Sequence, residues 1–206
     1  MSHYEERLQA DLDRLKSALA SVADDVQTAL KASVQALLAR DRGLASRTIL
    51  SDLQINRATR EIDQRCHAFV ALHLPAAGIL RFVSSVMRLT VALERIGDYA
   101  VTICRETVAL SDDPPAAVAR DIEMMADHAR QTLAQAVKSF TTENSELARG
   151  TMGMADQSFV KVFDDLVREG QEGSRSVSDL FALLVVLNRL ERVSNQAKNI
   201  CEETVF

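Results

Sequence analysis

The sequence predicts an all-α protein built as two tandem three-helix bundles, with six long helices related by an internal repeat. Apolar residues recur at steps of three and four over most of the chain, which is the period of an amphipathic helix. Aromatic residues make up only 4 % of the 206 residues, and there are 3 Pro and 7 Gly, a composition that disfavours a sheet protein with many turns. One segment near the end of the first half recurs in modified form near the end of the second, and such repeats organise a fold.

The first predicted bundle occupies residues 1–110. Its first helix follows an apolar stripe that ends near Arg40, and Asp41 is suited to cap the next helix because its side chain can accept a backbone N–H. The second helix is expected to stop at Leu74, since Pro75 disfavours helical backbone in the residue before it. The third helix is expected over about residues 76–110.

The clearest break is the Asp-Asp-Pro-Pro run that ends at Pro115, because proline suits the first turn of a helix and interrupts its interior. A second bundle is therefore predicted over residues 116–206. Ser176 lies three residues before Asp179, the spacing of a capping box, and predicts the start of the last helix. The three helices of this half are expected to run to about Phe140, over about residues 145–168, and from 177 to the end.

Charge and composition exclude several classes of protein. The net charge is −5 without a basic stripe, so nucleic-acid binding is not indicated. No apolar run reaches the roughly 18 residues of a membrane span, and the polar N-terminus does not resemble a signal peptide. The three cysteines, Cys66, Cys104 and Cys201, form no CxxC pair and suit a reducing compartment. We therefore expect a cytoplasmic protein that reaches a membrane only through partners.

The repeat joins residues 93–108 to residues 190–205 without a gap. The offset is a constant 97 residues, so that Glu94 corresponds to Glu191, and nine of the aligned positions are identical. Both segments lie in the third helix of their half, so the repeated segment and the helix order describe the same duplication.

The first copy carries two carboxylates in a mostly apolar helix. Glu94 and Asp98 are four residues apart and project from one helix face, where like charges repel. A cation could compensate, since hard metals bind carboxylate oxygens, and a nearby arginine is the alternative. A single pair of this kind is more often a solvated helix face. Gly97 costs about 1 kcal/mol against alanine inside a helix, which indicates close approach by a neighbouring helix.

The stretch from Arg81 to Asp98 resembles the first signature of the PhoU family of phosphate-signalling regulators, and residues 195–203 resemble the second. The resemblance covers essentially the whole chain. It implies tandem three-helix bundles that act as a negative regulator of phosphate uptake and of the phosphate-starvation response. It also implies contact with the ATPase subunit of the phosphate transporter and with a sensor histidine kinase, and a homodimer.

Some members of the family bind iron or zinc clusters, so the resemblance implies a site for iron, zinc or another divalent or trivalent metal. This chain departs from the family pattern where Asn195 replaces an aspartate, where Ile79 replaces an aspartate, and where residues 102–105 read Thr-Ile-Cys-Arg instead of Asn-Ile-Ala-Glu. The metal ligands implied by the resemblance are Glu94, Asp98, Glu191 and Asn195, with Asp52 and Asp156 from the second helix of each half, and the polar residues of the second signature are Asn199 and Glu202.

Two other functions stay open at this point. A helical adaptor of the same fold could serve another transporter or kinase, which the departure at Asn195 motivates. A metal-dependent carboxylate-bundle enzyme is the third alternative. No histidine follows a glutamate by three residues, so the Glu-x-x-His pairs of di-iron bundles are missing, and no phosphate-binding glycine loop supports nucleotide chemistry. We therefore expect a protein that is not an enzyme.

Overall fold

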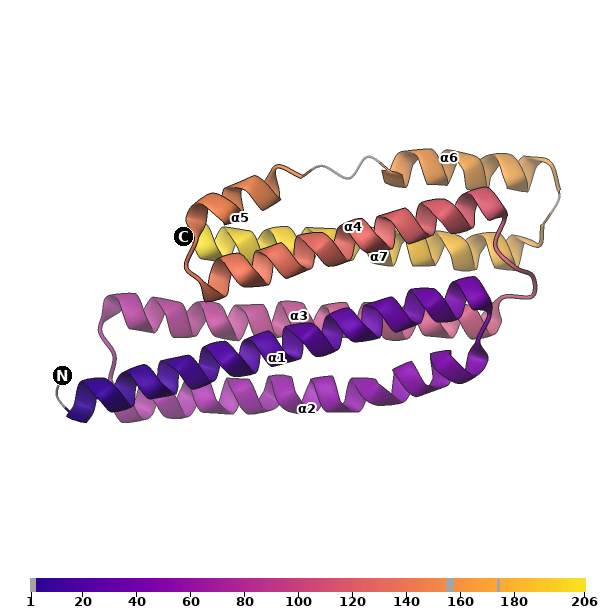
Figure 1. Ribbon diagram of the computed structural model, residues 1–206. Helices are drawn as coiled ribbons and strands as arrows, with labels where there is room; N and C mark the ends of the chain where they lie inside the picture. Colours follow the sequence, from indigo (N-terminus) through magenta and orange to yellow (C-terminus); the bar gives the residue numbers. More distant parts are fainter. Residues whose placement is uncertain (1–2, 155–157, 174) are drawn as a thin grey trace.

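The computed structural model describes residues 3–154, 158–173 and 175–206, and every regular element in that part of the chain is a helix (Figure 1). This confirms the predicted all-α class. None of the described helices is both long and apolar enough to cross a membrane. The helices are α1 (His3–Ala39), α2 (Arg42–His73), α3 (Ala77–Ala109), α4 (Ala116–Thr141), α5 (Ser145–Met152), α6 (Ser158–Gln171) and α7 (Val177–Val205).

The helix ends of the first half follow from local sequence. The side chain of Asp41 accepts the backbone N–H of Leu44 and caps α2, as its position predicted. Leu74 ends the same helix in a left-handed conformation, with φ at 44°, directly before Pro75. In the second half, Ser176 caps α7 by accepting the N–H of Asp179.

The prediction of one continuous helix over residues 145–168 is wrong. The structure has two helices there, the eight-residue α5 and then α6, so that seven helices are described instead of six. Gly150 and Gly153 fall within four residues, and glycine is the weakest helix former after proline, so the helix is weakened at this point. Gly153 is the C-cap of α5.

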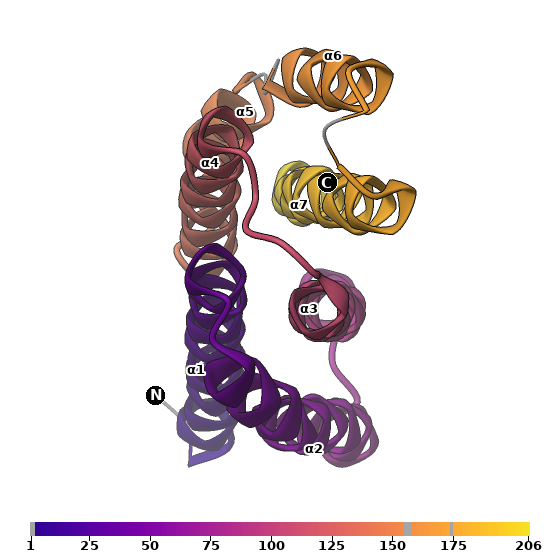
Figure 2. The ribbon, with the colours of Figure 1, turned by 90° about the vertical axis from the view of Figure 1, so that its right-hand side faces the viewer.

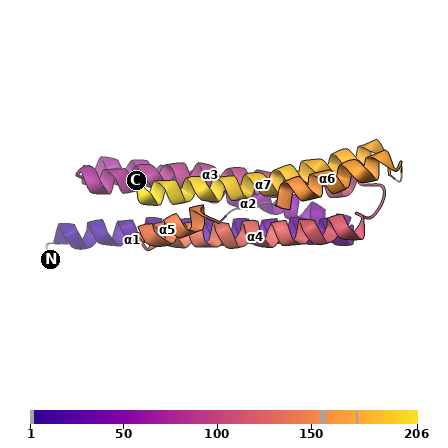
Figure 3. The ribbon, with the colours of Figure 1, turned by 90° about the horizontal axis from the view of Figure 1, so that it is seen from above.

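The seven helices are arranged in two layers joined along their length. In Figure 2, α1 lies beside α4 and α3 beside α7, while α2 covers one end of the assembly and α5 and α6 the other. Figure 3 shows α1, α4 and α5 in one layer and α3 and α7 in the other. One apolar cluster runs from Leu15 in α1 to Cys201 in α7, so both halves share a continuous core.

The connection between α3 and α4 is fixed from both halves. The guanidinium of Arg40 donates to the carbonyl oxygen of Ser111 at 2.6 Å and to that of Leu110 at 3.3 Å. The fully buried Asp179 accepts the backbone N–H of Ser111 at 2.9 Å. The start of the connection is thus hydrogen-bonded from both halves, which helps to hold the second half in register against the first.

Candidate functional site

The two copies of the repeat lie against each other along the contact between α3 and α7. Ser85, near the start of α3, bonds to Glu203 near the end of α7, while Tyr99, farther along α3, lies beneath the guanidinium of Arg189 in α7. The two helices are therefore antiparallel. Because the copies have a constant offset, this contact is approximately symmetric, and equivalent residues of the two halves lie toward opposite ends of it.

At the first copy, Asp52 of α2 lies directly against α3. A Cβ atom added to Gly97 would lie 3.2 Å from Oδ1 of Asp52 and 3.4 Å from Cγ2 of Ile55, so the glycine permits this close approach. This confirms the expectation that a neighbouring helix approaches closely at Gly97. Asn56 donates to Oδ2 of Asp52 at 2.7 Å, while Oδ1 is buried without a hydrogen-bond partner.

The electrostatic environment of Asp52 disfavours its negative charge. Burial raises the pKa of this carboxyl group, and the neighbouring carboxylate of Asp98 raises it further. The amide of Asn56 and the guanidinium of Arg105 act in the opposite direction. The structure therefore brings Asp52 and Asp98 close together, with the exposed Arg105 nearby as a positive charge.

The residues around Asp52 carry carboxylate oxygens, which are ligands that hard metal ions bind. Glu94 is partly buried and Asp98 is exposed, both on α3. Among residues 3–154, 158–173 and 175–206, no three His, Cys, Asp or Glu side chains converge as a protein-only metal site would require. The unpartnered Oδ1 of Asp52 beside Asp98 still favours a positive ion, and an all-oxygen donor set suits a hard cation better than zinc. The structure thus brings together two of the carboxylates that were predicted to bind a metal, Asp52 and Asp98.

The second copy has a different environment. Glu191 is partly buried and Asn195 is exposed on α7, and the residue equivalent to Gly97 is Ser194. The Oγ atom of Ser194 is buried and has no hydrogen-bond partner. Asp156, the expected partner from the second helix of this half, lies outside the described residues. Glu191 and Asn195 thus remain predicted ligands without a described carboxylate from a facing helix.

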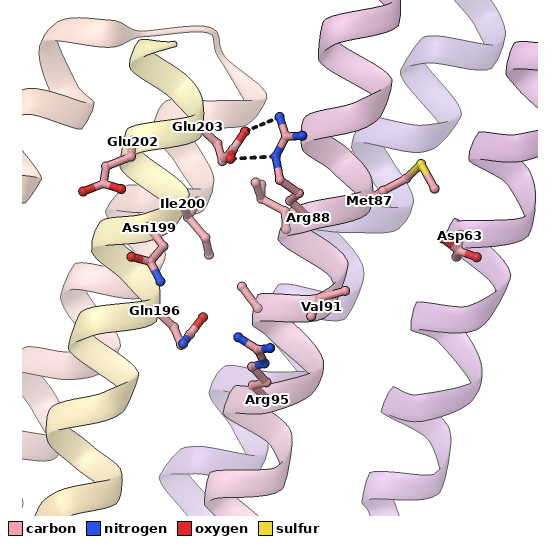
Figure 4. A pocket seen from close by; sticks show the side chains of 12 residues that line it. Asp63, Met87, Arg88, Val91, Arg95, Gln196, Asn199, Ile200, Glu202 and Glu203 are labelled. Atoms are coloured by element: carbon pink, nitrogen blue, oxygen red, sulfur yellow. Dashed lines mark hydrogen bonds and ion pairs between the residues drawn. The ribbon is translucent and has the colours of Figure 1, made fainter.

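The polar residues of the second signature lie in a surface pocket of about 560 Å³ over α3 (Figure 4). Asn199 and Glu202 come from α7, Arg95 comes from α3, and Asp63 lies on the α2 side. The floor is apolar, and Val91 contributes a side chain to it. Asn199 and Glu202 of the second signature therefore line a surface pocket, on the side of α7 that contacts the first copy of the repeat.

One end of this pocket is closed by an ion pair between the two halves. Nε of Arg88 donates to Oε1 of Glu203 at 2.6 Å, and a second guanidinium nitrogen donates to Oε2 at 2.7 Å (Figure 4). The hydroxyl of Ser85 donates to Oε2 at 2.8 Å. Burial acts to raise the pKa of Glu203, but the hydrogen bonds from Arg88 and Ser85 outweigh it, so that this pKa lies below its ordinary value.

Sequence reasoning did not single out Arg88, Ser85 or Gln196 as site residues. Arg88 gives a usable signal, because it is the one charged residue between Phe82 and Leu93. A charge in such an apolar stretch of helix needs a partner. The partner is 115 residues away, so its identity depends on the register between α3 and α7.

The fold places the chain in the class of helical proteins built from two tandem copies of one helical unit, with the middle helix of the second copy divided into α5 and α6. A crystal structure of PhoU from Pseudomonas aeruginosa superposes with a TM-score of 0.88 at 27 % sequence identity, covering 96 % of each chain. A PhoU phosphate transport system regulatory protein from Streptococcus pneumoniae shares the fold, with a TM-score of 0.88 at 23 % identity over 96 % of this chain and 95 % of that one.

The chain belongs to the PhoU family. The PhoU domain matches it twice, at residues 19–107 and 122–204. A Pseudomonas putida protein named "Phosphate-specific transport system accessory protein PhoU homolog" is 29 % identical over 99 % of this chain and 81 % of its own length. The Escherichia coli protein named "Phosphate-specific transport system accessory protein PhoU" is 25 % identical over 97 % of this chain and 84 % of its own length.

Proposed function

We propose that this protein is a cytoplasmic negative regulator of phosphate uptake and of phosphate-starvation signalling. It acts by protein contact between the ATPase subunit of a phosphate transporter and a sensor histidine kinase, without catalysing a reaction. The observation that carries this proposal is the double match to the PhoU domain across the two halves. The names of the related proteins, which describe accessory proteins of phosphate-specific transport systems, support it.

Deletion of the gene in its host tests the regulatory role. Under phosphate-replete conditions the deletion should raise both phosphate uptake and the expression of a starvation-controlled reporter, and the wild-type gene should restore both. A deletion strain whose uptake and reporter expression match the parent would refute the role. Whether the protein carrying the Arg88→Ala substitution complements the deletion then measures the contribution of the ion pair between the halves.

Co-purification at native expression level tests the partners. The proposal predicts recovery of a phosphate-transporter ATPase and a histidine kinase. Recovery of the ATPase of a different transporter would support the adaptor alternative and overturn the phosphate assignment. We further propose that the protein is a homodimer, for which light scattering during size-exclusion chromatography should give twice the chain mass of 22.7 kDa.

We also propose that the first copy of the repeat binds a hard divalent or trivalent cation. Asp52 and Asp98 supply the carboxylates, with Glu94 on the same face of α3 as Asp98. The unpartnered Oδ1 of Asp52 favours this site over the one at Glu191 and Asn195. A bound cation would offset the repulsion between the two aspartates and would attach α2 more firmly to α3.

Metal content of protein purified without a polyhistidine tag tests the cation site. Iron or manganese in the native protein should be lost in the Asp52→Asn/Asp98→Asn variant and retained in Glu191→Gln. Metal retained in the double variant, or lost only in Glu191→Gln, would place the ligands elsewhere, and a native protein without bound metal would overturn the cation site. In either case the deletion phenotype tests the regulatory role separately.

A further inference from the structure

The contact between α3 and α7 is approximately symmetric, but large side chains occupy only one of its two ends, and a pocket lies at the other. At the end that holds Tyr99, the guanidinium of Arg189 lies 5.7 Å from the centre of the tyrosine ring. Arg189 also lies near Glu106, whose pKa is raised by burial while the arginine acts to lower it. An aromatic ring and an arginine from the protein itself therefore occupy this end.

The equivalent residues at the other end are smaller. At the offset of 97 residues, Tyr99 corresponds to Gln196 and Arg189 corresponds to Ala92, while Glu106 corresponds to Glu203. The ring and the guanidinium are thus replaced by an amide and a methyl group. The pocket of about 560 Å³ lies at this end and is lined by both replacing residues. Its volume is in the range of small-molecule sites.

Two arginines line this pocket, and Arg95, unlike Arg88, has no acidic or hydrogen-bonding partner among the described residues. Its counterpart in the second half, Arg192, donates from Nε to Oδ1 of Asn188 one turn earlier, at 3.1 Å. The residue one turn before Arg95 is Val91, which cannot accept a hydrogen bond. Among the described residues, Arg95 makes no ion pair or hydrogen bond.

The side chains around Arg95 are also free to bind. Figure 4 shows Arg95 and Gln196 pointing toward one another across the pocket, with Asn199 one turn farther along α7. Within the described chain, neither amide has a hydrogen-bond partner. One guanidinium and two amides thus leave several N–H donors facing a pocket whose floor is apolar, with Val91 48 % exposed.

Two of the three acidic residues that line the pocket, Glu202 and Glu203, do not compensate the positive charge of Arg95. Glu203 is paired with the guanidinium of Arg88 in two hydrogen bonds. Glu202 points away from α3 in Figure 4. Asp63 lies on the α2 side of the pocket, where its carboxylate is 3.5 Å from a ring nitrogen of His67.

We propose that this pocket binds a small organic oxyanion, a carboxylate or a phosphate monoester. Arg95 binds the oxyanion through paired N–H donors, because a planar guanidinium matches two oxygens of such a group. Gln196 and Asn199 supply further donors, and the organic body packs over Val91 and Ala92. The proposal does not depend on the proposed regulatory function, and neither Asp52 nor Asp98 lines the pocket.

NMR titration of the full chain tests the proposal. The probes are phenyl phosphate and benzoate, with inorganic phosphate and acetate as ions lacking an organic body, and benzamide as the uncharged analogue. Phenyl phosphate or benzoate should shift the side-chain amide signals of Gln196 and Asn199 in a saturable way, and benzamide should not. The stronger of the two identifies the oxyanion. Equal affinity for the bare ions would overturn the packing of an organic body.

Two variants and a control locate the binding. Arg95→Gln should weaken binding at least tenfold. The variant Ala92→Arg/Gln196→Tyr, which copies the filled end, should abolish it with the helical circular dichroism unchanged. Arg192→Gln is the matched control in the other half and should leave the dissociation constant within twofold. No saturable shift with any probe, or binding that survives Arg95→Gln, would overturn the proposal, and neither result depends on the folding of the double variant.

Discussion

The ion pair between Arg88 and Glu203 joins residues 115 positions apart, and a double-mutant cycle should show that it contributes to stability. The side chain of Arg88 is 51 % exposed and that of Glu203 is 24 % exposed, so solvent screens the charges and neither partner becomes a fully buried lone charge when the other is removed. Exposed pairs contribute about 0.2–1 kcal/mol, and hydrogen bonds to charged groups about 1.5–3 kcal/mol. For this two-point, partly screened pair we expect a coupling of about 1 kcal/mol.

Urea unfolding of the wild type, Arg88→Ala, Glu203→Ala and the double variant measures the coupling. The coupling should fall in 1 M salt, since the pair is partly exposed. The matched control is the pair of Arg65 and Glu61 within α2, with side chains 49 % and 56 % exposed, for which we expect only about 0.3–0.5 kcal/mol.

The pH dependence gives a second test of the same pair. The folded-state pKa of Glu203 lies below its ordinary value of 4.5, so the unfolded chain takes up protons first as the pH falls. The stabilisation is therefore present above pH 4.5 and is lost as the pH falls through the lowered folded-state pKa. A coupling under about 0.3 kcal/mol at low salt, or one that persists after full protonation, would refute this account of how the halves are joined.

Three further changes test other parts of the fold. Gly97→Ala should lower stability by about 1 kcal/mol in urea unfolding, because overpacking against Asp52 outweighs the gain in helix propensity, and Asp52→Ala should remove most of this loss. With a metal chelator present, Asp52→Asn should raise the urea midpoint of unfolding at neutral pH, because the raised folded-state pKa of Asp52 means that the wild type loses stability as the pH rises through that pKa. The stability gained by the variant over the wild type should therefore grow between pH 4 and 7, and a constant difference would contradict this. Asp179→Ala should cost about 1–2 kcal/mol through the lost bond to the N–H of Ser111, and Asp179→Asn, which keeps an acceptor, should cost less; equal losses in the two variants would argue against the hydrogen bond.

The local features of the fold could be predicted from the sequence because they depend on a few adjacent residues. Asp41 and Ser176 cap helices through bonds to residues three positions away, and Pro75 acts on the residue before it. The break between α5 and α6 could not be placed from periodicity, because apolar residues such as Val162 and Leu166 continue the helical pattern beyond it. Gly150 and Gly153 favour a break in the helix, whereas the apolar periodicity favours a continuous helix, and the prediction followed the periodicity.

The candidate site was predictable only in part, since half of each contact comes from a distant element. Gly97 indicated that some helix lies close by, but the sequence did not establish that the contacting atom is Oδ1 of Asp52. Predicting the pocket at Arg95 requires both the offset between the copies and the register of the two helices. The constant offset that pairs Tyr99 with Gln196 can be read from the sequence, whereas the antiparallel register of α3 and α7 comes from the structure.

Residue differences between the two copies explain why the duplication has not produced two equal sites. In the first half, Gly97 admits Asp52 beside Asp98, whereas the second half has Ser194 in place of the glycine and the neutral Asn195 in place of the aspartate. Arg95 lies three residues before Asp98, about 60° around α3, so the pocket and the carboxylates border one another on this helix. Because one rigid helix carries both, a change that moves α3 relative to α2 or α7 alters both sites together, whereas a change in charge at one side chain can be confined to one of them.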